Sequence, residues 1–293
     1  LSAGVVVTIL VWHKSEWKPS FVFRYSSLKG MHRFSRGVLG TQILRYGANQ
    51  LDNLMVAKLL GTSDLGIYNR AKTFVLKPAR EINAKTRSVA YSALSKLDDP
   101  KEYRTTLFKF TLLLTMVIVP LLLIVLISSD TLIYTYLSSE WHPMINILKL
   151  LAISSIVIST SMPSQIMLSK GASYTLFKSE MITNVIKVGV LLFAFRFADL
   201  LSIVTLFLLG QVLSNLLQNI VAYRSVEGYK LMIWKYHILP IIMAFIVYSL
   251  AVVIDNYISY SLISMVCKLV ICLSIYGYYA WKTYPEILKS IRK

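Results

Sequence analysis

Many charged side chains lie in a stretch that we interpret as two membrane-spanning helices. The stretch covers residues 45–80, and its charged members include Arg45, Asp52, Lys58, Arg70, Lys72, Lys77 and Arg80. A charge at the centre of a membrane helix costs roughly 2.5–3.5 kcal/mol, whereas each Leu, Ile, Val or Phe contributes only about −0.3 to −0.6 kcal/mol. Such helices are expected to face protein or a water-filled cavity, which in a membrane protein is typically a substrate path.

The polar side chains are spaced so that each helix presents one polar face. On residues 37–60 this face holds Arg45, Asn49, Asp52 and Asn53, and on the next helix it holds Arg70, Thr73, Lys77 and Arg80. Lys72 falls off the second stripe and is expected to pack elsewhere. A structural alternative is a salt-bridge network that joins Asp52 to Arg45 or Arg70. Because the basic groups outnumber the acid, a cavity that admits water or an anionic ligand is favoured.

Later segments carry weaker polar signals. Gln211, Asn215 and Gln218 form one stripe of residues 201–223, which can line a cavity or bond neighbouring helices. Lys187 is deep enough in its segment to contribute to a site, whereas Glu180 is expected at a solvated helix start. Residues 159–165 include Pro163 and predict an ordinary proline kink, with a broken helix as the alternative.

The elements that position these residues are apolar runs of bilayer-spanning length. The chain has a mean hydropathy of +0.61 and 56% hydrophobic residues. Beyond the polar pair, the runs cover residues 107–127, 144–168, 174–197, 201–223, 236–254 and 261–281. The sequence therefore predicts an all-α polytopic membrane protein with about eight transmembrane helices. Residues 5–12 resemble the end of another span.

The net charge of +17 is distributed as expected of a membrane protein. Twenty-one Lys and Arg residues lie in alternate connectors and the C-terminal tail, whereas the intervening connectors hold two. The connector over residues 85–109 is one of the basic ones. This positive-inside pattern predicts a cytoplasmic C-terminus. It argues against nucleic acid as a partner, since nucleic-acid binding needs basic residues gathered on one folded face.

Enzymatic chemistry finds little support in the sequence. Four histidines are scattered at His13, His32, His142 and His237, so no metal site is predicted. No glycine-rich phosphate loop or nucleophile motif is present, so neither a cofactor nor a catalytic residue is predicted. A membrane glycosyltransferase or polymerase is the enzyme alternative, but its acidic pairs or large outer loop are not found.

One segment resembles a known family. The run ANQLDNLMVAKLLGTSDLGIYNRA (residues 48–71), followed by Pro78 and by AYSALS (residues 90–95), is similar to the repeat-unit flippases of bacterial polysaccharide synthesis. These belong to the multidrug/oligosaccharidyl-lipid/polysaccharide exporter superfamily. The matching positions are Asn49, Asp52, Asn53, Gly61, Leu65, Gly66, Tyr68, Leu94 and Ser95. Tyr91 departs from the pattern, because the family often has proline there.

The resemblance implies two six-helix lobes that face each other in a V, with accessory C-terminal helices. Residues 37–223 would form the second, C-terminal lobe, and residues 224–293 would form two accessory transmembrane helices and a basic tail. Residues 1–36 would hold the end of a transmembrane helix and a basic cytoplasmic connector. The chain begins without Met inside an apolar run, so we interpret it as the C-terminal part of a longer protein.

The implied function is to flip an undecaprenyl-pyrophosphate-linked oligosaccharide across the bacterial plasma (inner) membrane. Cations would hold the diphosphate and amides would bind sugar hydroxyls. The expected substrate-binding residues are Arg45, Asn49, Asn53, Arg70, Lys77, Arg80, Lys187, Gln211 and Asn215. Asp52 is the candidate for ion coupling. The implied partners are the lipid-linked oligosaccharide, membrane lipid, and polysaccharide polymerase or chain-length proteins.

Two other functions stay open at this point. A multidrug exporter of the same superfamily usually handles cations, so its cavity should favour acidic residues, opposite to the pattern here. A non-transporting membrane component of a polysaccharide assembly complex is the second alternative.

Overall fold

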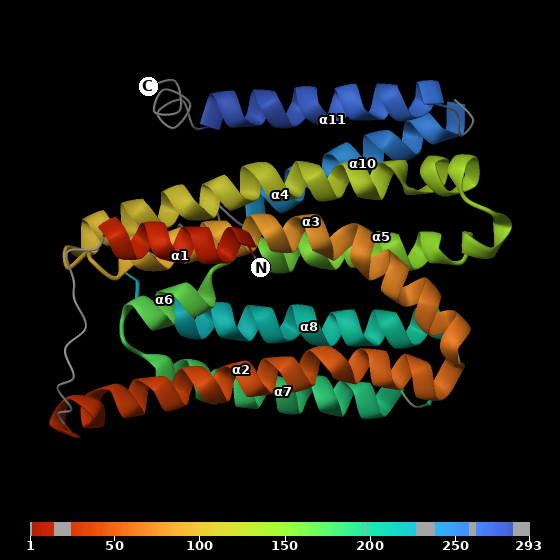
Figure 1. The fold of residues 1–293 in the computed structure, drawn as a ribbon. Helices are drawn as coiled ribbons and strands as arrows, with labels where there is room; N and C mark the ends of the chain where they lie inside the picture. Colours follow the sequence, from red (N-terminus) through yellow and green to blue (C-terminus); the bar gives the residue numbers. More distant parts are fainter. Residues whose placement is uncertain are drawn as a thin grey trace.

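The computed structural model describes residues 2–14, 25–194, 196–197, 199–226, 238–257 and 262–283. In these residues all regular structure is helical, which confirms the predicted fold class (Figure 1). The elements are α1 (Ser2–Lys14), α2 (Tyr25–Leu60), α3 (Thr62–Leu94), α4 (Pro100–Tyr136), η1 (Ser139–Trp141), α5 (Met144–Ser159), α6 (Pro163–Ser169), α7 (Ser173–Ala194), α8 (Leu200–Tyr223), α10 (Leu239–Tyr257) and α11 (Leu262–Thr283).

Three segments of the described chain are long and apolar enough to cross a membrane. They are α4, the α5–α6 segment (Met144–Ser169) and α8. α10 and α11 add shorter apolar stretches, Pro240–Ile254 and Ile263–Tyr279. The count of about eight spans and the division into a connector, a six-helix lobe and two accessory helices stay predictions.

Several helices are longer than their apolar runs. α2 begins at Tyr25 rather than near residue 37, and α4 has 37 residues, about 55 Å at 1.5 Å per residue. The start of α4 has a local cause, since the Asp99 side chain accepts a hydrogen bond from the backbone N–H of Glu102 at 3.0 Å. Pro100 occupies the first helical turn, where its missing N–H is tolerated. Hydropathy alone misses such polar helix ends.

The helices pack as a bundle in which α3 joins two groups (Figure 1). α2 packs on α7, and α7 packs on α8. α3 leaves the end of α2 and crosses to α4 and α5, while α10 and α11 pack on α4. The turn between α2 and α3 is made by Gly61, whose φ of +89° is a conformation that glycine adopts without steric cost.

Two glycines allow α2 to approach α7 closely. A Cβ atom on Gly37 would lie 2.9 Å from the backbone carbonyl carbon of Ser173, and one on Gly40 would lie 2.5 Å from the ring of Phe177. Small residues at a helix interface let the backbones come together in a membrane. The close approach positions the middle of α2 against α7.

The predicted proline kink is wrong, because the helix is broken. α5 ends at Ser159 and α6 begins at Pro163, and the residues between them are not helical. The carbonyl oxygen of Ser161 accepts a hydrogen bond at 2.8 Å from Nη2 of Arg87 on α3. Irregular backbone at membrane depth is tolerated where protein groups satisfy it. Sequence could not show this partner, which lies 74 residues away.

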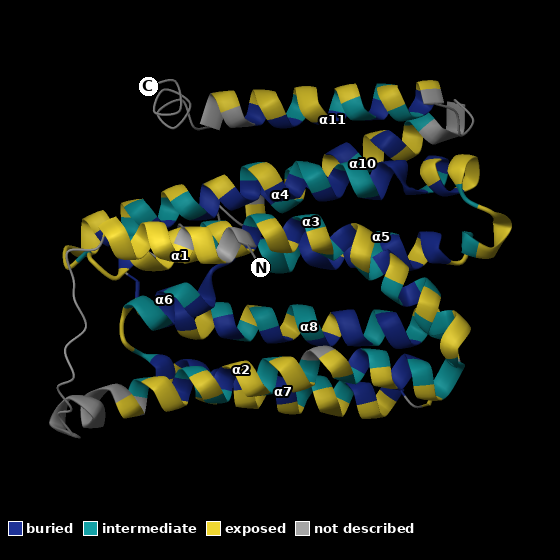
Figure 2. Ribbon diagram, viewed as in Figure 1, coloured by how far each residue is buried: buried dark blue, intermediate teal, exposed yellow. Residues whose placement is uncertain are grey.

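Exposed and buried residues alternate around the helices so that polar groups can face inward. Figure 2 shows this alternation on α2, α7 and α8. On α2 the side chains of Ile43, Tyr46 and Leu54 are exposed, whereas Asp52 is buried. An apolar outer face allows a charged helix to contact lipid on one side and protein on the other.

Candidate functional site

A cavity of about 500 Å³ lies among α2, α3, α5, α6, α7 and α8. Among the residues described, its charged lining consists of Arg45, Asp52, Lys72, Arg80, Arg87, Glu180 and Lys187. Five of these are basic and two are acidic, so the wall carries a net positive charge at neutral pH. Hydroxyl and amide side chains fill much of the remaining lining, including Ser154, Ser155, Ser159, Ser164, Gln211, Ser214, Asn215 and Gln218.

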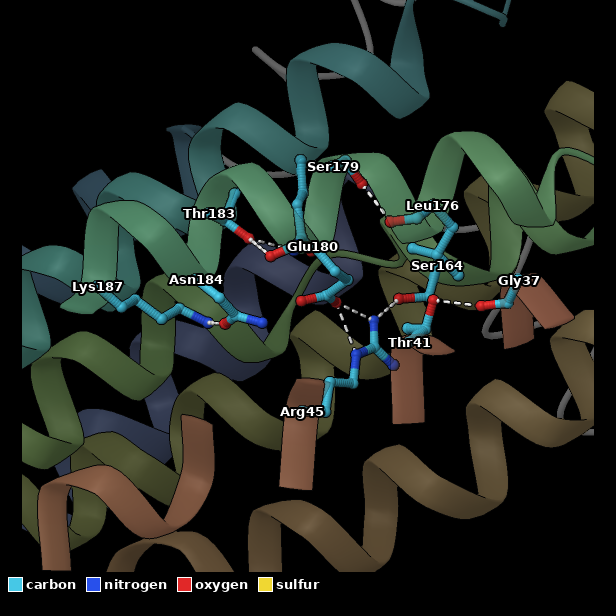
Figure 3. A network of polar contacts seen from close by, with 11 residues as sticks. Gly37, Thr41, Arg45, Ser164, Leu176, Ser179, Glu180, Thr183, Asn184 and Lys187 are labelled. Atoms are coloured by element: carbon cyan, nitrogen blue, oxygen red, sulfur yellow. Dashed lines mark hydrogen bonds and ion pairs between the residues drawn. The ribbon is translucent and has the colours of Figure 1, made fainter. Parts of the chain in front are cut away.

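Arg45 of α2 is at the centre of one polar network (Figure 3). Its Nε donates to Glu180 Oε1 of α7 at 2.6 Å, and its Nη2 lies 2.5 Å from the same oxygen. Nη2 also donates to the hydroxyl of Ser164, just after the start of α6, at 2.6 Å. One guanidinium therefore holds together three helices that line the cavity.

Glu180 does not lie at a solvated helix start, so that expectation is wrong. The side chain of Glu180 is 3% exposed, and that of Arg45 is 34% exposed. The reason is the close contact of α2 with α7 at Gly37 and Gly40, which places Glu180 against Arg45. A buried carboxylate needs a cation or several donors, and Arg45 supplies both.

Asp52 forms a second network with α3. Its Oδ2 lies 2.5 Å from Nζ of Lys72 and accepts a hydrogen bond from the hydroxyl of Tyr68 at 2.7 Å. Lys72 Nζ also donates to Oδ1 of Asn53 at 3.2 Å. The partner of Asp52 is therefore Lys72, not Arg45 or Arg70. The expectation that Lys72 packs away from the polar stripe is wrong.

The rotation of α3 explains this difference. Ala71, Val75 and Ala79 are fully buried against neighbouring helices and fix which face of α3 turns inward. The cavity face of α3 consequently carries Tyr68, Lys72, Leu76, Arg80, Asn83, Ala84 and Arg87. Charge spacing alone suggested a stripe rotated away from this face.

Arg70 and Lys77 are exposed and lie away from the cavity lining. The guanidinium carbon of Arg70 is 5.9 Å from the ring centroid of Phe74 and 5.8 Å from that of Trp141 in η1. These distances are typical of cation–π contacts. The structure thus gives Arg70 aromatic neighbours in place of the predicted ligand-facing position, and it removes Lys77 from the cavity wall.

Most of the remaining predicted site residues line the cavity, and one contacts a residue that lines it. Arg45, Arg80, Lys187, Gln211, Asn215 and the coupling candidate Asp52 line the cavity. Asn53 is linked to that wall through Lys72. The side chain of Asn49 lies outside the described part of the structure.

The stripe on α8 serves both of the roles considered for it. Gln211 and Asn215 face the cavity, and Asn215 Oδ1 accepts a hydrogen bond from Asn219 Nδ2 at 2.9 Å. Gln218 donates to the hydroxyl of Thr183 on α7 at 3.2 Å, so it also joins two helices. Amides on one helix face can therefore line a polar cavity and bond a neighbouring helix at once.

Arg87 is a cavity residue that does not appear among the predicted site residues. The charge pattern assigns it to the basic connector over residues 85–109, but α3 extends to Leu94 and carries Arg87 to the cavity wall. Its spacing from Lys72, Arg80 and Asn83 follows a helical face, which is the signal that could have identified it.

Some donors and acceptors at the cavity wall and beside it have no hydrogen-bond partner. Within the described part of the chain, these are Nε of Arg87 and Oδ1 of Asp52 on the wall, and the buried Nδ2 of Asn184, which lies on α7 outside the lining. Buried polar atoms are usually paired, so each of these is a place where a ligand, water or a moved side chain can bind. The cavity is thus equipped to bind a polar, anionic group.

Comparison with known proteins places these features in a family. The family described as polysaccharide biosynthesis protein matches residues 1–146, about half of the chain. The lipopolysaccharide biosynthesis protein WzxC of Escherichia coli is 22% identical over 247 residues, which cover 82% of this chain and 50% of that protein.

Two further relatives point the same way. The teichuronic acid biosynthesis protein TuaB of Bacillus subtilis is 30% identical over 168 residues, covering 56% of this chain and 35% of that protein. The succinoglycan biosynthesis transport protein ExoT of Rhizobium meliloti is 25% identical over 146 residues, which cover 50% of this chain and 30% of that protein.

The chain spans about half the length, or less, of these curated relatives. No solved structure matches it significantly. Both the family match and the apolar helices fit a location in a membrane. Together with the resemblance at residues 48–71, these findings identify the chain as a member of the polysaccharide biosynthesis protein family.

Proposed function

We propose that this chain is the cavity-bearing part of a transporter that flips a lipid-linked oligosaccharide across the bacterial plasma membrane. The observation that carries the proposal is the net positive charge of a cavity that lies between the helices. A diphosphate joined to a polyprenyl lipid is an anion that must cross an apolar layer. Fixed guanidinium and ammonium groups can replace part of the water that it loses there.

The polar uncharged lining suits the sugar part of such a substrate. Gln211 and Asn215 present amides, and Ser154, Ser155 and Ser159 add hydroxyls. Sugar hydroxyls bind to groups of this kind. The names of the relatives support the same class of cargo, because they refer to lipopolysaccharide, teichuronic acid and succinoglycan biosynthesis.

Three further parts of the proposal rest on the sequence patterns and on the family resemblance. The C-terminus is cytoplasmic, the chain acts without catalysing a reaction, and polymerase or chain-length proteins are its partners in the membrane. A drug exporter for cations is disfavoured, because its cavity needs an acidic surplus while five basic residues face two acidic ones among the described lining residues.

Reconstitution into proteoliposomes tests the transport function. Vesicles would contain a radiolabelled undecaprenyl-diphosphate-linked oligosaccharide, and an impermeant glycosidase outside would report sugar that reaches the outer leaflet. Sugar should become accessible faster than in protein-free vesicles, and Arg45→Ala combined with Arg87→Ala should remove most of the increase. A rate equal to that of protein-free vesicles would reject the proposal.

A further inference from the structure

Glu180 poses a problem for any anion that enters the cavity. Both Nε and Nη2 of Arg45 point to Glu180 Oε1, so the carboxylate occupies the guanidinium edge that a phosphate oxygen would use (Figure 3). Carboxylate and phosphate bind to guanidinium in the same bidentate manner. An incoming phosphate therefore has to compete with a group that belongs to the protein.

The place that the phosphate would take is built from two converging arginines. Arg45 contacts the hydroxyl of Ser164, and Arg87 contacts the carbonyl of Ser161, so both reach the break between α5 and α6. Nε of Arg87 is buried and has no partner within the described residues. A guanidinium with an unused donor beside a second guanidinium is suited to an anion with several oxygens.

A second place for the Glu180 carboxylate lies on its own helix. Asn184 and Lys187 follow Glu180 at i+4 and i+7, so the three side chains share one face of α7, as Figure 3 shows. Nδ2 of Asn184 is buried and without a partner in the described part of the chain. Lys187 Nζ is 3.5 Å from Oδ1 of Asn184, a long contact. Both groups can donate to a carboxylate that has left Arg45.

We propose that Glu180 is a displaceable internal counter-anion. In the empty cavity it neutralises Arg45, and when a diphosphate binds to Arg45 and Arg87 it moves to Asn184 and Lys187. This inference rests on the proposed function, since it specifies how that cavity exchanges its anion. Because Glu180 recaptures Arg45 when the ligand leaves, it limits how tightly the diphosphate is held and favours its release.

Binding of inorganic pyrophosphate to the purified protein in nanodiscs tests the competition. Glu180→Gln removes the competing charge but keeps an oxygen that can accept from Arg45. It should tighten pyrophosphate binding by about tenfold or more, since charge-assisted hydrogen bonds to a phosphate are no longer shared with a carboxylate.

Asp52→Asn is the matched control, because it removes one negative charge from the same wall at a residue that is paired with Lys72 rather than Arg45. It should tighten pyrophosphate binding by less than about threefold, through the general charge alone. Thermal unfolding of each variant checks that the fold is kept.

The outcomes separate the two proposals. Equal tightening in Glu180→Gln and Asp52→Asn, or no change in Glu180→Gln, would overturn the role of Glu180 and leave the proposed function standing. Absence of pyrophosphate binding in the wild type and both variants would overturn both proposals. Selective tightening in Glu180→Gln, together with slower flipping in proteoliposomes, would support the exchange mechanism.

Discussion

Arg87 and Arg70 lie on the same helix but in different surroundings. Arg87 lines the cavity and donates to the carbonyl of Ser161, whereas Arg70 is exposed beside Phe74 and Trp141. The two arginines thus form a natural pair for comparison, because both carry the same charge on α3. Their different neighbours imply different contributions to substrate binding.

Replacement of Arg87 by Ala is expected to slow oligosaccharide transfer by at least about tenfold, because a guanidinium is lost from the anion site. Arg70→Ala is expected to stay within about twofold of the wild type, since Arg70 is exposed and its aromatic contacts lie away from the cavity lining. The initial rate of sugar exposure in proteoliposomes measures both. Similar losses in the two variants would contradict the site as assigned.

Asp52 remains the candidate for ion coupling. Its Oδ2 is taken by Lys72 and Tyr68, while its Oδ1 is buried and has no partner among the described residues. A free carboxylate oxygen can accept a proton or contact a sodium ion. The acid therefore has both a fixed position and a spare binding site.

Asp52→Asn should abolish the dependence of transfer on a proton or sodium gradient. Asp130→Asn is the control, because Asp130 is also an acid of a membrane helix, paired with Lys149 at 2.6 Å but lying away from the cavity lining. Transfer rates would be compared with and without each imposed gradient. If Asp52→Asn responds to both gradients as the wild type does, Asp52 has no coupling role.

The contact between α2 and α7 sets the geometry of the Arg45–Glu180 pair. Gly37 and Gly40 leave no room for a side chain, whereas Gly47, further along α2, has no atom within 4 Å of the place where a Cβ would be. The three glycines therefore differ in what they do. Gly37 and Gly40 are needed for packing, but Gly47 is open to substitution.

Gly37→Ala is expected to lower the free energy of unfolding by about 1–3 kcal/mol, because the methyl group meets backbone atoms of Ser173 that cannot rotate away. Gly47→Ala should be neutral or raise it by up to about 1 kcal/mol through helix propensity. Unfolding of the purified protein in detergent measures both. Equal stability of the two variants would argue against a close α2–α7 contact.

Helix positions were predictable where apolar composition alone defines them. The predicted runs at residues 201–223 and 261–281 agree closely with α8 and α11. The start of α4 could not be predicted from apolar composition, because it depends on a helix cap by the side chain of Asp99. Neither the rotation of α3 nor the burial of Glu180 follows from charge spacing. Both depend on packing between distant segments, which a single sequence does not record.

The whole molecule combines an apolar core with a polar cavity, and apolar side chains also lie on its outer faces. Seven charged residues of α2, α3 and α7 line the cavity within the described part of the chain, while side chains such as Ile43, Val185 and Leu209 remain exposed on the outer faces. An apolar exterior fits a lipid surrounding, and the polar interior provides a route that lipid does not.

The positive-inside pattern predicts which ends of these helices face the cytoplasm. The turn after α2, with one lysine nearby at Lys58, should lie outside, and the basic segment around residue 98 should lie inside. Ser63 and Asp98 are both exposed and can be replaced by Cys in a Cys267→Ser, Cys272→Ser background. In intact cells an impermeant maleimide should label Ser63→Cys but not Asp98→Cys, and permeabilised cells should give labelling of both. The opposite labelling pattern would show that the topology is inverted, and the predicted cytoplasmic C-terminus would then be wrong.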